Sequence, residues 1–93
     1  MSGRALACIV AFHPLPESLA ALVGQLCADA GAVLVIDNGD TLDPRDPLWA
    51  GHANLSWHRP GRNLGVAAAL NVAVAHAIAH GFDYMHAFDQ DSR

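Results

Sequence analysis

The chain has 93 residues, of which 53% are hydrophobic and 15% are charged. This length supports one small domain, and this composition is typical of a globular chain rather than a disordered one. The balance of five arginines and nine acidic residues argues against sequence-independent nucleic-acid binding and against a polybasic membrane patch. We expect no membrane-spanning segment, because no apolar run approaches the roughly 20 residues needed, and we expect a cytoplasmic location.

The first third of the chain has the pattern of a strand, a helix and a second strand. Residues 6–12 form a continuous apolar run, as in a strand covered on both faces of a parallel sheet. Residues 17–30 have apolar positions three and four apart, which indicates an amphipathic helix that ends at Gly31. Residues 32–36 form a second buried strand. Cys8 and Cys27 lie inside these elements, so we expect buried thiols rather than a disulfide.

The rest of the chain has a loop, a strand, a helix and a final strand. Residues 40–53 contain two prolines, three aspartates and a glycine, and predict a loop with one helical turn near Leu48. Residues 54–58 alternate as in a short edge strand, residues 66–80 predict a helix, and residues 82–88 predict the last strand. The predicted apolar stripe of the second helix contains Val66, Ala67, Leu70, Val74, Ala77 and Ile78.

The order β-α-β-β-α-β predicts an α/β fold with an open, parallel, Rossmann-like sheet, for which we expect the strand order 3-2-1-4. Ligands of such sheets bind beyond the carboxyl ends of the strands. Polar clusters occur at or just after those ends: His13, Asp37, the loop 62–65, and Asp89 with Asp91. We therefore predict a nucleotide site along one edge of the sheet.

Two of these clusters have both a functional and a structural interpretation. Asp37 can accept a hydrogen bond from a ribose hydroxyl or a base N–H, or it can form an Asx turn with Asn38. Gly65 allows the backbone to approach a ligand closely, and the helix N-terminus after Asn63 suits a phosphate or a base carbonyl. Arg62 would add a charge-assisted contact. Ordinary helix capping explains the same loop without a ligand.

Asp89 and Asp91 are two residues apart, so in a continuing strand they would face the same side and share one hard cation. Such a pair suits Mg²⁺ or Mn²⁺, with further oxygens from water and substrate phosphates. A solvated acidic loop is the alternative. His76 and His80 have the spacing for two imidazoles on one helix face, but we expect no zinc site, because no further ligand stands near them in sequence.

Four blocks together resemble a known family: Ala-Phe-His-Pro from Ala11, Ile-Asp-Asn-Gly from Ile36, Arg-Asn-Leu-Gly-Val-Ala-Ala-Ala-Leu-Asn from Arg62, and Phe-Asp-Gln-Asp-Ser from Phe88. In this order they are similar to the nucleotide-binding half of family 2 glycosyltransferases, which have the GT-A fold. The similarity is greatest to the bacterial rhamnosyltransferase branch, and it extends over residues 5–93.

The resemblance implies that residues 1–93 form the nucleotide-sugar-binding half of a GT-A domain. Family members displace a nucleoside diphosphate from the anomeric carbon, usually with inversion, using a metal ion and a carboxylate base. Their base and acceptor pocket follow the Asp-x-Asp, so we expect no catalytic residue here and donor binding without transfer. The implied donor-binding residues are Ala11, Phe12, His13, Asp37, Arg62, Asn63, Gly65 and Asp89, with Asp89 and Asp91 as the metal ligands.

The implied donor is a dTDP- or UDP-linked sugar, most directly of the rhamnosyl type. The outer edge of the last strand would be unpaired, which predicts a homodimer through that edge. A non-catalytic, self-associating α/β module derived from a glycosyltransferase is the alternative function. A dinucleotide site is excluded, because His13 and Pro14 stand where the glycine fingerprint would follow the first strand.

Overall fold

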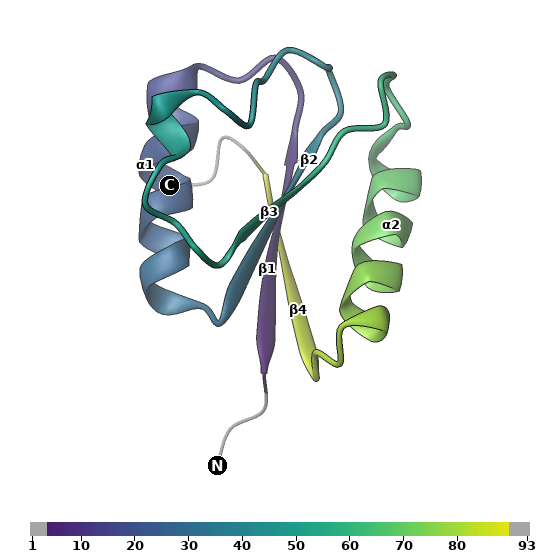
Figure 1. The fold of residues 1–93 in the computed structure, drawn as a ribbon. Helices are drawn as coiled ribbons and strands as arrows, with labels where there is room; N and C mark the ends of the chain where they lie inside the picture. Colours follow the sequence, from purple (N-terminus) through teal and green to yellow (C-terminus); the bar gives the residue numbers. More distant parts are fainter. Residues whose placement is uncertain (1–3, 90–93) are drawn as a thin grey trace.

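The computed structural model describes residues 4–89, in which a four-stranded sheet lies between two helices (Figure 1). All strand pairs are parallel, and their order is β3-β2-β1-β4. The predicted α/β class, open parallel sheet and strand order are therefore confirmed. The elements are β1 (Ala5–Ala11), α1 (Pro16–Asp29), β2 (Ala32–Asp37), the 3₁₀ helix η1 (Pro47–Trp49), β3 (Leu55–His58), α2 (Val66–Ala79) and β4 (Tyr84–Asp89).

The two helices cover opposite faces of the sheet (Figure 1). Successive residues of β1 point to opposite faces, so Ile9 packs with Leu19 and Val23 on the α1 side, while Cys8 packs with Ala73 on the α2 side. This double coverage explains why β1 and β2 are continuous apolar runs rather than alternating ones.

The long loop before β3 is held on the α1 side of the sheet. Its helical turn, predicted near Leu48, is η1, and Asp46 caps it by accepting a hydrogen bond from the backbone N–H of Leu48 at 3.0 Å. Trp49 is buried and meets Trp57 of β3 edge to face, with ring centroids 5.1 Å apart. The loop thus completes the core on this face and fixes β3 against β2.

The buried face of α2 differs from the predicted stripe. Ala69 and Ala73 are fully buried and Ala77 is nearly so, and of these the prediction included Ala77 alone. Alanine side chains allow a helix to lie close to a sheet, and the prediction favoured the larger apolar residues instead. Three of those larger residues are exposed, with 64%, 44% and 75% of their surface accessible to solvent: Val66, Val74 and Ile78.

The cysteines are free, as predicted: Cys8 is buried and Cys27 is half-buried. Burial raises the pKa of the Cys8 thiol to about 11 and also raises the pKa of Cys27. Neither helix between residues 4 and 89 is long and apolar enough to cross a membrane.

Candidate functional site

The carboxyl ends of three neighbouring strands reach one edge of the sheet. In the strand register, Ala11 at the end of β1 pairs with Asp37 of β2, and Val10 pairs with Asp89 of β4. The backbones of Asp37 and Asp89 therefore lie on either side of β1, about 10 Å apart or two strand spacings. The structure brings these two predicted positions to the same edge, as expected from the parallel topology.

Asn38 joins this edge to the loop before α2. Its backbone N–H donates to the carbonyl of Ala11 at 2.7 Å, and its side-chain Oδ1 accepts from the backbone N–H of Leu64 at 2.8 Å. The residue is only 3% exposed. Sequence reasoning assigned Asn38 to a turn and missed this contact, because nothing in the local pattern indicates a partner 26 residues away.

The loop at Asn63 ends in an open backbone turn at the start of α2. The Oδ1 of Asn63 accepts from the backbone N–H of Gly65 at 2.8 Å. Gly65 has φ +80° and ψ 162°, a region that essentially only glycine occupies. No heavy atom lies within 4 Å of the position that a Cβ at Gly65 would take. The turn at Gly65 therefore faces open space.

The first turn of α2 has N–H groups that a ligand can use. Among the described residues, no side chain caps this helix, and its first turn contains no acidic residue. The initial N–H groups of a helix carry partial positive charge and lack intrahelical acceptors. Arg62, three residues before Gly65, is exposed and makes no hydrogen bond or ion pair within residues 4–89. This end of α2 therefore suits an anionic ligand.

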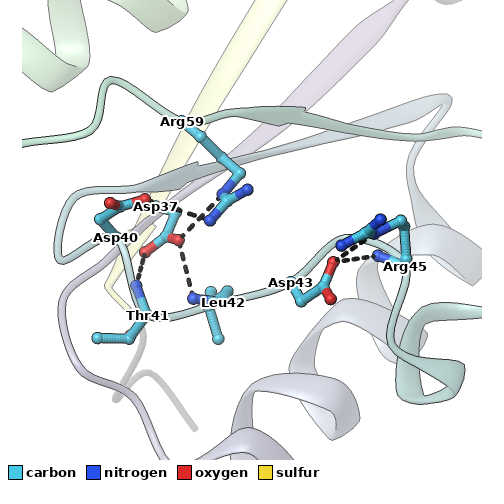
Figure 2. A network of polar contacts seen from close by, with 7 residues as sticks. All are labelled: Asp37, Asp40, Thr41, Leu42, Asp43, Arg45 and Arg59. Carbon is cyan, nitrogen blue, oxygen red and sulfur yellow. Dashed lines mark hydrogen bonds and ion pairs between the residues drawn. The ribbon is translucent and has the colours of Figure 1, made fainter.

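Asp37 is fully buried, and both of its carboxylate oxygens are used within the chain (Figure 2). Oδ1 accepts from the backbone N–H of Thr41 at 3.3 Å, and Oδ2 accepts from that of Leu42 at 3.0 Å. The Nε of Arg59 lies 3.6 Å from Oδ2. These contacts favour the structural interpretation of Asp37, in which it anchors the loop after β2.

Arg59 links the end of β3 to this same loop. Its Nη2 donates to Oδ1 of Asp40 at 3.2 Å, so the guanidinium lies between two carboxylates (Figure 2). Asp40 itself has a left-handed backbone, with φ +54°. Further along the loop, the backbone N–H and the side chain of Arg45 hydrogen-bond to Asp43 and lower the pKa of that exposed carboxyl.

Phe12 and His13 form an exposed aromatic pair at the end of β1. Their ring centroids are 4.2 Å apart in an edge-to-face arrangement. His13 has φ +46°, an uncommon conformation for a residue with a Cβ. A Cβ at Gly39 would lie 3.1 Å from the His13 backbone nitrogen and 3.3 Å from its Nε2, so a larger residue there would press against His13. Exposed aromatic rings of this kind are surfaces on which a base can stack.

The predicted metal ligands fall at the limit of what the structure describes. Asp91 lies outside the described residues, and for Asp89 only the backbone is described. Within residues 4–89, no group of three or more histidine, cysteine or acidic side chains is arranged to hold a metal ion. His76 and His80 stack on each other with ring centroids 4.1 Å apart. The Asp-x-Asp metal site stays a prediction.

One curated protein relates the chain to a known activity. The dTDP-rhamnosyl transferase RfbF of Shigella flexneri is 32% identical to it over all 93 residues. The chain spans 31% of the length of that protein. No protein-family model matches the chain, and no solved structure matches it. The chain is therefore related to a glycosyltransferase and corresponds to part of one.

Proposed function

We propose that this chain forms the donor-binding part of a family 2 glycosyltransferase with the GT-A fold, and that it binds a dTDP-linked sugar of the rhamnosyl type. The observation that carries the proposal is the meeting of the β1, β2 and β4 ends with the loop at Asn63 on one edge of the sheet. The relationship to a dTDP-rhamnosyl transferase supports the choice of donor. UDP is the alternative nucleotide.

In this proposal, different described residues contact different parts of the donor. The base stacks against Phe12 and His13 beside Ala11, where an exposed aromatic surface exists. The deoxyribose and diphosphate lie over the turn from Asn63 to Gly65 and the first N–H groups of α2, with the guanidinium of Arg62 as counter-charge. In this proposal Asp37 contributes by anchoring the loop after β2, because its oxygens are already bonded.

Asp89 and Asp91 would hold a Mg²⁺ or Mn²⁺ ion at the end of β4. Two carboxylates leave most of a six-oxygen shell for water and for phosphate oxygens, and this donor set fits a hard cation. When bound, such an ion stabilises the charge on the departing nucleoside diphosphate. We propose an inverting displacement for the whole enzyme. Because the chain corresponds to 31% of its relative, we assign donor binding to it rather than complete transfer.

Calorimetric titration tests the donor proposal. We expect dTDP to bind more tightly than UDP, and both to bind more tightly with Mn²⁺ than without it. Asp91→Asn should abolish the Mn²⁺ dependence, whereas the control Asp29→Asn, at the exposed end of α1, should leave it unchanged. Absence of heat with either nucleotide at millimolar concentration would contradict the proposal.

Self-association through β4 is a second proposal, favoured by the position of this strand. Among the described strands β4 lies at one edge of the sheet, and Tyr84 at its start is 57% exposed. Cavities of about 420 Å³ beside α1 and about 170 Å³ beside α2 flank the strand on the two faces of the sheet. We propose a homodimer joined through β4. Light scattering that detects monomer alone at every concentration would exclude it.

A further inference from the structure

We propose that Asn38 is a positioning residue that holds the turn from Asn63 to Gly65 in its ligand-binding place. This inference rests on the proposed function, because it names the residue that fixes part of the donor site. Asn38 itself contacts no donor in the proposal. It acts through Leu64, the residue at the centre of the turn.

Asn38 is held through both its backbone and its side chain. Its backbone N–H is bonded to the end of β1 at 2.7 Å, and its side chain is bonded to Leu64 at 2.8 Å. Asn38 directly follows the last residue of β2. One buried residue thus relates the loop before α2 to the ends of two adjacent central strands.

Among the described residues, few other hydrogen bonds attach the turn from Asn63 to Gly65. The Asn63–Gly65 hydrogen bond is local to the turn and cannot place it relative to the sheet. Within the described part of the chain, the bond between Asn38 and Leu64 is the one hydrogen bond that joins residues 60–64 to the sheet or its connecting turns. Its loss would leave the position of the turn to packing alone.

The uncharged amide of Asn38 suits its position beside a buried carboxylate. Asn38 stands next to the fully buried carboxylate of Asp37, which Arg59 faces at 3.6 Å. An aspartate in place of Asn38 would put a second buried carboxylate beside Asp37. The two negative charges would repel each other, and the second would have no cation of its own. The amide supplies the oxygen that the N–H of Leu64 requires and adds no charge. Consecutive residues therefore hold different loops: Asp37 the loop after β2, and Asn38 the loop before α2.

The test compares three variants of the whole chain. Asn38→Leu keeps the approximate size but removes the acceptor, and Asn38→Ser is a milder change whose hydroxyl is too short to replace it. Val23→Ala is the matched control, because it weakens the core beneath α1 without touching this edge. For each variant we measure the amide hydrogen exchange of Leu64, the dTDP affinity and the urea midpoint.

We expect Asn38→Leu to speed exchange of the Leu64 amide by about tenfold or more relative to that of Ala73, consistent with loss of one hydrogen bond. We expect its dTDP dissociation constant to rise by about tenfold, and that of Val23→Ala to stay within about twofold. Asn38→Ser should show the same pattern to a smaller degree, and it decides the matter if Asn38→Leu does not fold.

Two results would overturn the inference. One is an unchanged Leu64 exchange rate in the Asn38 variants, which would show that the bond does not hold the turn. The other is faster exchange with unchanged dTDP affinity, which would leave Asn38 a purely structural residue. If the unmodified chain fails to bind dTDP, the proposed function fails, and so does the assignment to a donor site. The Leu64 exchange rate then still decides whether Asn38 holds the turn.

Discussion

Asp37 and Asn38 are neighbours with the same burial and different partners. Both lie at the end of a central strand, where a polar side chain leaves water only if the chain supplies its hydrogen bonds. Asp37 obtains them from Thr41 and Leu42, and Asn38 obtains one from Leu64. In residues 4–89 no buried side-chain nitrogen or oxygen lacks a partner. The polar end of β2 is therefore a structural junction that shapes the site around it.

The positive φ of Gly65 makes this position sensitive to substitution. Gly65→Ala should lower the free energy of unfolding by about 1–3 kcal/mol, because its φ of +80° with ψ of 162° is closed to residues with a Cβ. Gly24→Ala is the control. It lies inside α1 with no atom near the added methyl group, and it should raise the free energy of unfolding by about 0.5–1 kcal/mol. Urea denaturation measures both. A neutral Gly65→Ala would show that the turn relaxes.

Helix α2 is buried through a different face from the one that its apolar pattern predicted. It contains no acidic or basic residue other than His76, so its sequence offers little contrast between a polar and an apolar side. Burial of Ala69 and Ala73 lets the helix backbone approach the sheet, and the larger side chains then point elsewhere. Size alone was therefore a poor guide to which face is buried.

The two faces of α2 predict responses of different size to substitution. Ala73→Leu should lower the free energy of unfolding by about 1–3 kcal/mol, because a fully buried alanine against the sheet leaves no room for a larger side chain. Ile78→Glu, at a position that is 75% exposed, should change it by about 0.5 kcal/mol or less. Chemical denaturation of the two variants compares them. A larger decrease in the free energy of unfolding for Ile78→Glu than for Ala73→Leu would support the buried face of α2 that was predicted from the sequence.

The molecule has two hydrophobic cores, one on each face of the sheet. The radius of gyration is 12.3 Å, equal to the value of about 12 Å expected for a compact chain of this length. Cys8 lies in the central strand with α2 above it, so its thiol meets solvent only when the sheet opens. Cys27, on α1, is half-buried.

The reaction rates of the two cysteine thiols measure how readily the sheet opens. Reaction with a disulfide reagent near pH 8 should modify Cys27 at least about tenfold faster than Cys8, because only the thiolate reacts and the Cys8 site is closed. Equal reaction rates would indicate an open sheet.

The pKa of Cys8, about 11 in the folded chain, lies above its ordinary value of 9.0. The free energy of unfolding is therefore unaffected by this thiol below pH 9 and falls as the pH rises from 9 towards 11, because the unfolded chain releases the proton more readily than the folded chain. Cys8→Ala should remove this part of the decrease in the free energy of unfolding at alkaline pH.

Much of the fold and part of the site followed from sequence alone. Apolar runs of strand length alternating with helical patterns predicted the parallel sheet and its order, because right-handed crossovers leave few arrangements. The same topology predicted that Asp37 and Asp89 reach one edge, since parallel strands end together. The roles of Asp37 and Asn38 were less accessible. Their partners depend on loop paths, which local patterns do not determine.

The amino-acid pattern was enough to predict the order of elements, the edge at which polar residues gather, and the resemblance that names a class of ligand. The folded chain shows in addition which residues at that edge are already hydrogen-bonded. Asp37 is committed to its loop, Asn38 reaches Leu64, and Gly65 faces open space. The physical reason is distance: hydrogen bonds act over about 3 Å, and segments 26 residues apart meet only when the chain has folded.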